Sequence, residues 1–261
     1  MSTFAPARIP SPLDATPRVV RHGDGDRIFV ALHGWSGSHR SFDPLLPHLP
    51  PGATLWSFDQ PGFGQTASPP KWELPTLLDL LEPVAQADDR PFTVLGVSGG
   101  AIVALLWALR LEHRVERLVL LDPFAFVPWY FRIFTLPVFG TLLYFAVFAN
   151  PLGRALTNAG LKPHRTTYDD LVGGFRGARH LDNLRYLRCL SRAVTVTPER
   201  IPFEGRVDIL YGERTFRAVR RSLPLWKAAL PQARCIEVPG AGHLPIFEAP
   251  GAVAKRVFEP D

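Results

Sequence analysis

Short apolar runs alternate along most of the chain with segments in which apolar residues recur at helical spacing. Continuous apolar runs are typical of strands that are covered on both faces. Strands alternating with helices in this way predict a mostly parallel sheet with helices on both faces. The predicted strands are residues 18–22, 28–32, 53–58, 92–97, 115–122, 207–212 and 234–238. The predicted helices are residues 41–48, 75–87, 101–109, 219–230 and 250–258.

The alternation stops between residues 123 and 202. This stretch is aromatic and proline-rich in its first half, then arginine-rich and helical. We therefore expect an α/β core formed by residues 1–122 and 203–261, with residues 123–202 inserted as a helical cap. Residues 1–17, which are rich in Pro and small residues, are expected to be a loosely packed leader.

A Gly-x-Ser-x-Gly turn joins the predicted strand 92–97 to the helix that follows it. A strand that turns sharply into a helix strains the central residue and leaves no room for a Cβ at Gly96 and Gly100. The Ser98 hydroxyl would then stand on the tip of the turn, beside the unpaired N–H groups of a helix start. The pattern is common in loops, but here the strand before it and the helix after it favour a nucleophile.

Four motifs in the same order resemble those of the α/β-hydrolase family. They are His33-Gly34-Trp35, Asp59-x-Pro-Gly-x-Gly-x-Thr66, Gly96-x-Ser98-x-Gly100 and Gly242-His243-x-Pro245-x-x-Glu248-x-Pro250. The resemblance covers nearly everything outside the insertion and implies an eight-stranded-type sheet. It gives no chemical step to Asp59 or Glu248, which we interpret as carboxylates that organise loops.

The resemblance also implies roles around the serine. His243 follows Ser98 and an acid in the family's order and would be the general base. Backbone N–H groups of Trp35 and Gly99 would form the oxyanion hole. His33 is a competing histidine, and we assign it a structural role below the site.

The third member of the triad departs from the family pattern. Thr215 stands where the family usually has an aspartate, and a threonine cannot carry the charge that stabilises an imidazolium. Asp122, at the end of the strand after the nucleophile helix, is the favoured acid, as in certain haloalkane dehalogenases. Glu213 is the alternative acid, and Asp122 would then only cap the first turn of the insertion.

Composition restricts the partners. The net charge is +5, yet no basic run, zinc spacing or aromatic RNA-binding motif accompanies it, so we expect a solvated Arg-rich surface and no nucleic acid. Cys189 and Cys235 belong to no metal-binding pattern, which suits a reducing compartment. No signal peptide is visible, so we expect a cytoplasmic protein without cofactor or metal.

Residues 133–149 are uncharged over 17 positions, which is slightly short for a membrane span. Pro137 and Gly140 interrupt the run, so we expect a buried or interface-lying cap segment. The arginines that follow suggest weak peripheral contact with an anionic membrane through the cap. A solvated cap surface is the other interpretation.

These residues predict a serine hydrolase that cleaves a carboxylic ester through an acyl-enzyme on Ser98. The aromatic half of the insertion predicts a small-molecule substrate with a lipophilic group. A serine at this turn, in place of aspartate, argues against dehalogenase or epoxide-hydrolase chemistry. A C–C hydrolase, thioesterase or lactonase would share the triad. Thr215 also leaves open a catalytically weakened binding protein.

Overall fold

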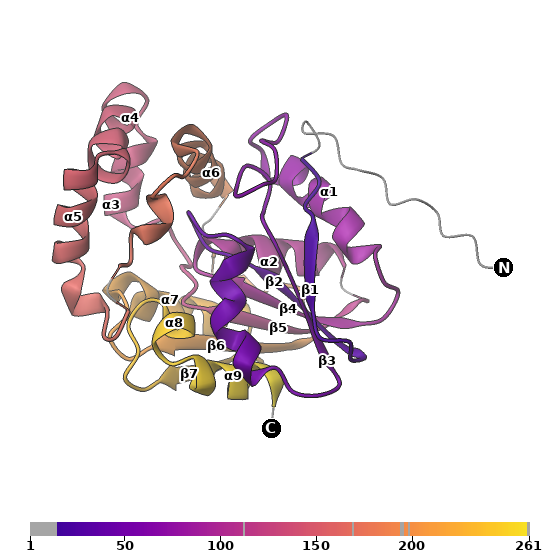
Figure 1. The fold of residues 1–261 in the computed structure, drawn as a ribbon. Coiled ribbons are helices and arrows are strands. Elements are labelled where there is room, and N and C mark those ends of the chain that lie inside the picture. Colours follow the sequence, from indigo (N-terminus) through magenta and orange to yellow (C-terminus); the bar gives the residue numbers. More distant parts are fainter. Residues whose placement is uncertain (1–14, 112, 169, 194–195, 198, 260–261) are drawn as a thin grey trace.

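The computed structural model describes residues 15–111, 113–168, 170–193, 196–197 and 199–259, which form a seven-stranded sheet covered by helices (Figure 1). The strands are β1 (Val19–His22), β2 (Arg27–Leu32), β3 (Ala53–Phe58), β4 (Phe92–Val97), β5 (Val115–Leu121), β6 (Arg206–Gly212) and β7 (Arg234–Val238). Their spatial order is β1-β3-β2-β4-β5-β6-β7. Only β1 is antiparallel to its neighbour, so the predicted mostly parallel sheet is confirmed. It has seven strands in the described residues, where the resemblance implied eight.

Helices cover both faces of the sheet. The core helices are η1 (His39–His48, a 3-10 helix), α1 (Leu74–Ala85), α2 (Gly99–Arg110), α7 (Arg217–Ala229), α8 (Pro245–Glu248) and α9 (Pro250–Phe258). Helices α1 and α2 contact each other on one face, while α8 and α9 contact η1 on the other.

The alternation of side chains along each central strand builds two apolar layers. In β2, Val30 and Leu32 pack with the side chains of α1 and α2, whereas Phe29 and Ala31 pack with those of η1 and α9. All four are buried. A fully apolar strand is therefore required at this position, which explains why the unbroken apolar runs identify the sheet.

A buried ion pair fastens the last helix to the sheet. The Arg117 Nε on β5 donates to the Asp208 carboxylate on β6 over 2.7 Å. The same guanidinium donates to the carbonyl oxygens of Arg256 and Val257 in α9. Both charged groups are almost completely buried, and Arg206 and Arg234 also pair with the Asp208 carboxylate, which compensates its buried charge.

Between β5 and β6 lies the segment that we call the insertion, residues 123–202. Its helices in the described residues are α3 (Trp129–Arg132), η2 (Ile133–Thr135), α4 (Val138–Tyr144), η3 (Phe145–Ala149), α5 (Pro151–Gly160), η4 (Lys162–His164), η5 (Gly173–Phe175) and α6 (His180–Ala193). Figure 1 shows α3, α4 and α5 together at one side of the molecule, with α6 between them and the core. Tyr186 and Leu190 of α6 belong to the same apolar cluster as β4 and β5, so the insertion shares a core with the sheet.

The uncharged run of residues 133–149 is broken into separate helices. Among the described residues no single helix is long and apolar enough to cross a membrane. One pair, Trp129–Thr135 and Val138–Ala149, meets that test of length and composition only when taken together, and it is bent by 112° at the break. Pro137 lies at that break.

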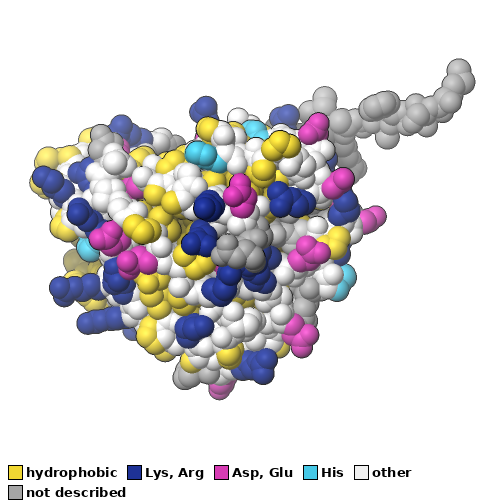
Figure 2. Space-filling view, turned by 90° about the horizontal axis from the view of Figure 1, so that it is seen from below, with side chains coloured by type: hydrophobic (Ala, Val, Ile, Leu, Met, Phe, Trp, Pro, Cys, Tyr) yellow, Lys and Arg dark blue, Asp and Glu magenta, His cyan; other side chains and the backbone are white. Residues whose placement is uncertain are grey.

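Two smaller findings concern the N-terminus and the charge. The expected loose leader lies mostly outside the described residues, but Ala15 and Pro17 are buried. Figure 2 shows Lys and Arg side chains distributed over one face of the molecule with Asp and Glu side chains among them.

Candidate active site

Ser98 lies between the end of β4 and the start of α2, in a conformation that few residues adopt. Its φ and ψ angles are 50° and −117°. The turn is possible because its flanking glycines have no side chains: a Cβ on Gly96 would lie 2.5 Å from the Ala101 Cα, and a Cβ on Gly100 would lie 2.1 Å from the His33 carbonyl oxygen. The Ser98 N–H donates to the Leu121 carbonyl on β5 over 2.8 Å, which fixes the turn against the sheet.

The structure brings His243 and Asp122 together, although they are far apart in the sequence. His243 Nδ1 lies 3.2 Å from Asp122 Oδ2, and Asp122 is completely buried. Burial raises the pKa of Asp122, while His243, Thr215 and the N–H of Gly212 favour its charged form. Since an aspartate beside Nδ1 directs Nε2 away from itself, Nε2 is the nitrogen free to accept a proton.

Thr215 contributes a contact that the sequence did not reveal. Its hydroxyl donates to Asp122 Oδ2 over 3.0 Å and lies 3.5 Å from His243 Nδ1. The Gly212 N–H donates to Asp122 Oδ1 over 3.1 Å, so both carboxylate oxygens have donors. Thr215 therefore occupies the usual acid position and touches the same two residues that an acid there would serve.

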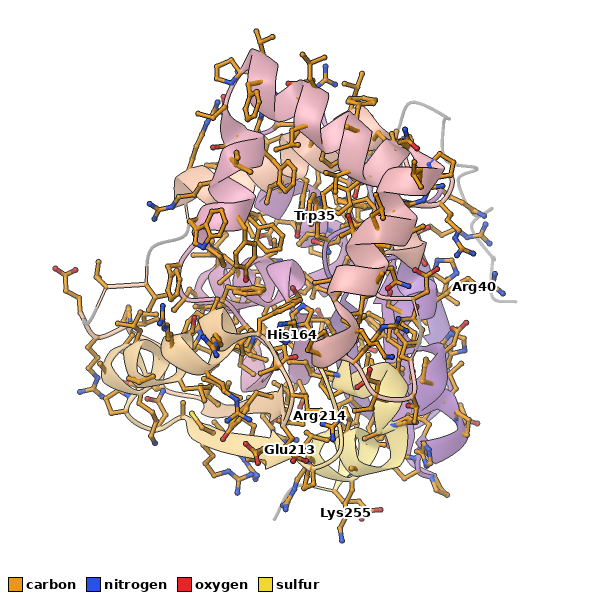
Figure 3. All side chains as sticks on the ribbon, turned by 90° about the vertical axis from the view of Figure 1, so that its left-hand side faces the viewer. Trp35, Arg40, His164, Glu213, Arg214 and Lys255 are labelled. Atoms are coloured by element: carbon orange, nitrogen blue, oxygen red, sulfur yellow. The ribbon has the colours of Figure 1, made fainter. Side chains whose placement is uncertain are left out.

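Glu213, the alternative acid, lies elsewhere. Its carboxylate accepts from the Gly240 N–H over 2.8 Å, at the exposed surface. Figure 3 shows Glu213 low in the molecule beside Arg214, with His164 and Trp35 successively higher. This hydrogen bond fixes the turn after β7, and among the described residues Glu213 makes no contact with His243.

The turn after β2 lies against the serine turn. A Cβ on Gly34 would lie 3.3 Å from the Ser98 Cβ, and a Cβ on Gly99 would lie 3.8 Å from the Trp35 nitrogen. In the described part of the chain, the N–H groups of Trp35 and Gly99 have no acceptor. Two unpaired donors beside a serine hydroxyl are the geometry that binds a developing oxyanion.

Strained backbone gathers at this edge of the sheet. Among the described residues, three that are not glycine have positive φ: Ser36, Ser98 and Asp122. They follow β2, β4 and β5. Such strain persists where surrounding contacts enforce it, and it is typical of functional sites.

His33 holds two loops together from a fully buried position. Its Nε2 accepts from the Gln60 N–H over 3.1 Å, and its Nδ1 lies 2.8 Å from the Gly34 carbonyl oxygen. This pattern requires the neutral tautomer with hydrogen on Nδ1. Burial lowers the pKa of His33 to about 4. The ring is thus fully engaged below the site.

Two more carboxylates organise loops. Although burial opposes it, hydrogen bonds from the N–H of Gln65 and from His39 lower the pKa of Asp59. Glu248 accepts from the N–H of Thr166 in the insertion and from the N–H of Gly242 beside the histidine.

An apolar cavity of about 810 Å³ opens over these residues. Ser98 and His243 both line it, and aromatic side chains of the insertion, including Phe131, Phe134 and Phe148, form much of the rest. No hydrogen bond joins Ser98 to His243 in the residues that the structure describes; such contacts are often long before substrate binds. Only some of the aromatic side chains of the insertion line the cavity as predicted. These three rings face it, whereas Trp129 and Phe139 are exposed.

No group of three or more His, Cys, Asp or Glu side chains among the described residues is arranged to hold a metal ion. Cys189 and Cys235 are both free thiols.

Comparison with known proteins defines the class. A model of the alpha/beta hydrolase family matches residues 29–256. The chain therefore belongs to the alpha/beta hydrolase family.

Individual relatives match a smaller part of the chain. The pimeloyl-[acyl-carrier protein] methyl ester esterase of Neisseria meningitidis serogroup C is 34% identical over 102 residues, which make up 39% of this chain and 39% of that protein. A serine hydrolase-like protein of Danio rerio is 30% identical over 106 residues, 39% of this chain and 32% of that protein. The chain thus spans well under half the length of the curated relatives that it matches.

Solved structures match over almost the whole chain. A thermophilic esterase from Thermogutta terrifontis has a TM-score of 0.74 at 17% identity and covers 93% of this chain and 92% of its own. The putative non-heme bromoperoxidase BpoC from Mycobacterium tuberculosis has a TM-score of 0.73 at 19% identity, covering 93% and 94%. At these identities the likeness shows a shared fold.

Proposed function

We propose that this protein is a serine hydrolase that cleaves a carboxylic ester with a lipophilic group. Ser98 is the nucleophile, His243 the general base, Asp122 the acid that orients it, and the N–H groups of Trp35 and Gly99 the oxyanion hole. The observation that carries the proposal is the 3.2 Å contact between His243 and Asp122 at the wall of the cavity that Ser98 also lines.

The chemistry follows from these positions. The Ser98 oxygen attacks the ester carbonyl carbon while its proton passes to His243 Nε2. The carbonyl oxygen becomes an oxyanion that accepts from Trp35 and Gly99. The imidazolium returns its proton to the departing alcohol as the carbonyl re-forms, leaving an acyl-enzyme. Water then repeats the attack with His243 as base, which releases the carboxylic acid and restores Ser98.

Asp122 serves this cycle by holding the ring and stabilising its charged form. An imidazolium next to a buried carboxylate is favoured because solvent does not screen the pair. The donors Thr215 and Gly212 keep the carboxylate oriented. Thr215 is a positioning residue because it acts through Asp122.

The substrate class follows from the cavity wall and from the relatives. Aromatic side chains from the insertion, which we propose is a cap, exclude water and favour an apolar acyl or alcohol group. Relatives are named as methyl ester esterases and serine hydrolases, which supports ester cleavage.

Labelling with a fluorophosphonate tests the nucleophile. We expect one covalent adduct on Ser98 in the folded wild-type protein and none in Ser98→Ala. Ser68→Ala is the matched control, since that hydroxyl lies outside the cavity and donates to Asp182. Wild-type protein that is folded and unlabelled would refute the proposal.

A panel of p-nitrophenyl esters tests the substrate class. We expect kcat/KM to rise from acetate to longer acyl chains, because each buried methylene adds about 0.8 kcal/mol of transfer free energy. Thioesters and lactones of matched acyl length are the competitors. Faster turnover of either would assign the triad to that bond instead.

A further inference from the structure

Helix α5 exposes apolar side chains and directs polar side chains inward, the reverse of an ordinary surface helix. Its exposed positions include Leu152, Ala155 and Leu156, and each leucine is 66% exposed. Its polar side chains point inward and have partners there: Arg154 donates to the carbonyl oxygens at the end of η3, and Asn158 accepts from the Leu171 N–H. A surface helix normally shows water its polar face, so this arrangement requires a reason.

The same surface continues over α3 and α4. Seven of the eight large apolar side chains that are exposed in the described residues lie between residues 129 and 156. Six of them define what we call the apolar outer face: Trp129, Val138, Phe139, Leu142, Leu152 and Leu156. Concentration of exposed apolar side chains on one region marks an interaction site.

The chain segment that carries this face has charged residues of one sign. From Pro123 to Tyr168 the chain has four basic residues and no acidic one. Arg132 lies between Trp129 and Val138 in the sequence and Lys162 follows Leu156, and both are exposed. Figure 2 shows apolar side chains beside basic ones along its left-hand edge, the side on which α4 and α5 lie in Figure 1.

We propose that the apolar outer face docks this protein onto the surface of an anionic lipid bilayer. Apolar side chains would enter the boundary between head groups and acyl chains, while Arg132 and Lys162 pair with lipid phosphates. A second copy of the chain fits less well, because it would bring the same positive charges into contact.

The face lies on the bilayer and does not cross it. Opposite the exposed residues, Phe134, Tyr144 and Phe148 are buried in an aromatic cluster of the insertion with Phe175. Trp35 packs edge-on against the Phe131, Phe148 and Phe175 rings of the same part of the molecule. Helices anchored in this way on one side have only their outer side free for lipid.

This inference goes beyond the proposed ester hydrolysis. Binding to lipid requires neither Ser98 nor His243, so vesicle binding and turnover of a water-soluble ester are separate readouts. If Ser98→Ala loses turnover but still binds vesicles, the result supports a docking surface that is independent of the active site. Loss of vesicle binding with turnover intact would remove the docking surface alone.

Co-sedimentation of the full chain with vesicles tests the proposal. We expect binding to phosphatidylcholine vesicles containing 30% phosphatidylglycerol, much weaker binding to pure phosphatidylcholine, and release of part of the bound protein by salt. Leu152→Glu/Leu156→Glu should weaken binding at least about ten-fold. Arg132→Gln/Lys162→Gln should remove most of the dependence on anionic lipid.

Gln86→Glu/Ala87→Glu is the matched control for the glutamate pair. It makes the same charge change on two exposed residues after α1, which leads to the amino end of β4 and hence to the opposite edge of the sheet. Far-ultraviolet circular dichroism and turnover of p-nitrophenyl butyrate report that each variant is folded. Neither leucine lines the cavity, so that turnover should persist.

Four outcomes would overturn the proposal. The first is no binding of folded wild-type protein to anionic vesicles at low salt. The second is equal binding by the leucine variant and its control. The third is a wild-type dimer, seen by analytical ultracentrifugation, that Leu152→Glu/Leu156→Glu dissociates, which would make the face an interface between copies. Wild-type protein that stays in the membrane after an alkaline carbonate wash would also overturn it, in favour of insertion.

Discussion

At the scale of single residues, Asp122, Thr215 and His243 contact one another at the site of the proposed chemistry. The carboxylate and the hydroxyl come from the ends of β5 and β6, and both lie within reach of one imidazole nitrogen. The usual acid position is therefore filled by a small polar side chain whose partner is the carboxylate on the neighbouring strand.

Exchanging the acid between the two positions should separate the candidates. Asp122→Asn should lower kcat by about 10³- to 10⁴-fold, as loss of the orienting acid does in other triads. Asp122→Asn/Thr215→Asp should recover part of the activity, because the Thr215 hydroxyl lies 3.5 Å from His243 Nδ1. Ester turnover measured on the folded variants checks both.

Glu213→Gln is the control for this exchange. Its carboxylate holds the Gly240 N–H at the surface, so kcat should stay within about two-fold of wild type. A loss equal to that of Asp122→Asn would assign the acid to Glu213. Failure of the folded double variant to recover any activity would contradict the proposed geometry at Thr215.

Sequence reasoning reached part of this arrangement. It favours Asp122 because this residue ends the strand after the nucleophile helix, a position that certain haloalkane dehalogenases use for the acid. It treated Thr215 only as a missing charge. The hydroxyl and its carboxylate partner are 93 residues apart, and no local pattern encodes a bond of that kind.

At the scale of elements, the serine turn depends on the space that two glycines leave between β4 and α2. The helix approaches the strand so closely that Ala101 and Ala104 would both meet a side chain on Gly96. Close approach of this kind is why the turn can place the Ser98 hydroxyl on its tip.

Gly96→Ala should lower the free energy of unfolding by about 2 kcal/mol, because the added methyl group meets a backbone atom at 2.5 Å that cannot rotate away. Gly160→Ala is the control: it ends α5, and nothing lies within 4 Å of its added methyl group. That variant should be as stable as wild type or slightly more so. Urea unfolding measures both, and equal stability of the two variants would contradict the packing argument.

Strands were easier to predict than helices. All seven predicted strands are strands in the structure. The central ones are apolar runs because a strand with both faces covered tolerates few polar side chains. The helix predicted at residues 75–87 runs from Leu74 to Ala85, a shift of the size usual for helix ends. Within the insertion, helix boundaries follow contacts between aromatic rings that are distant in sequence. The sequence therefore shows that the run of residues 133–149 is interrupted, but not where each helix begins and ends.

At the scale of the whole molecule, stability should depend on pH through His33. The unfolded chain takes up a proton on this side chain near pH 6.5, whereas the folded protein does so only near pH 4. Between these values the unfolded state binds more protons, so stability is full above pH 6.5 and falls as the pH drops toward 4. The expected loss between pH 7 and pH 5 is about 2 kcal/mol.

Urea unfolding at pH 7 and pH 5 measures this loss. His33→Gln is the control, since an amide oxygen can still accept from the Gln60 N–H but carries no titrating group. The variant should be less stable than wild type at pH 7 and should lose less between the two pH values. An identical loss in both proteins would place the acid sensitivity on other groups.

The Glu248 carboxylate has a mechanical consequence. It accepts hydrogen bonds from the N–H of Thr166 and from the N–H of Gly242, in the turn that carries His243. The His243 N–H also donates to the His164 carbonyl oxygen over 2.8 Å. Residues 164–166 are therefore held to the turn that carries His243, and moving them outward would also move the imidazole away from Asp122. A movement of the insertion that admits a small molecule while His243 stays in contact with Asp122 must therefore occur earlier in the chain, in the segment from α3 to α5.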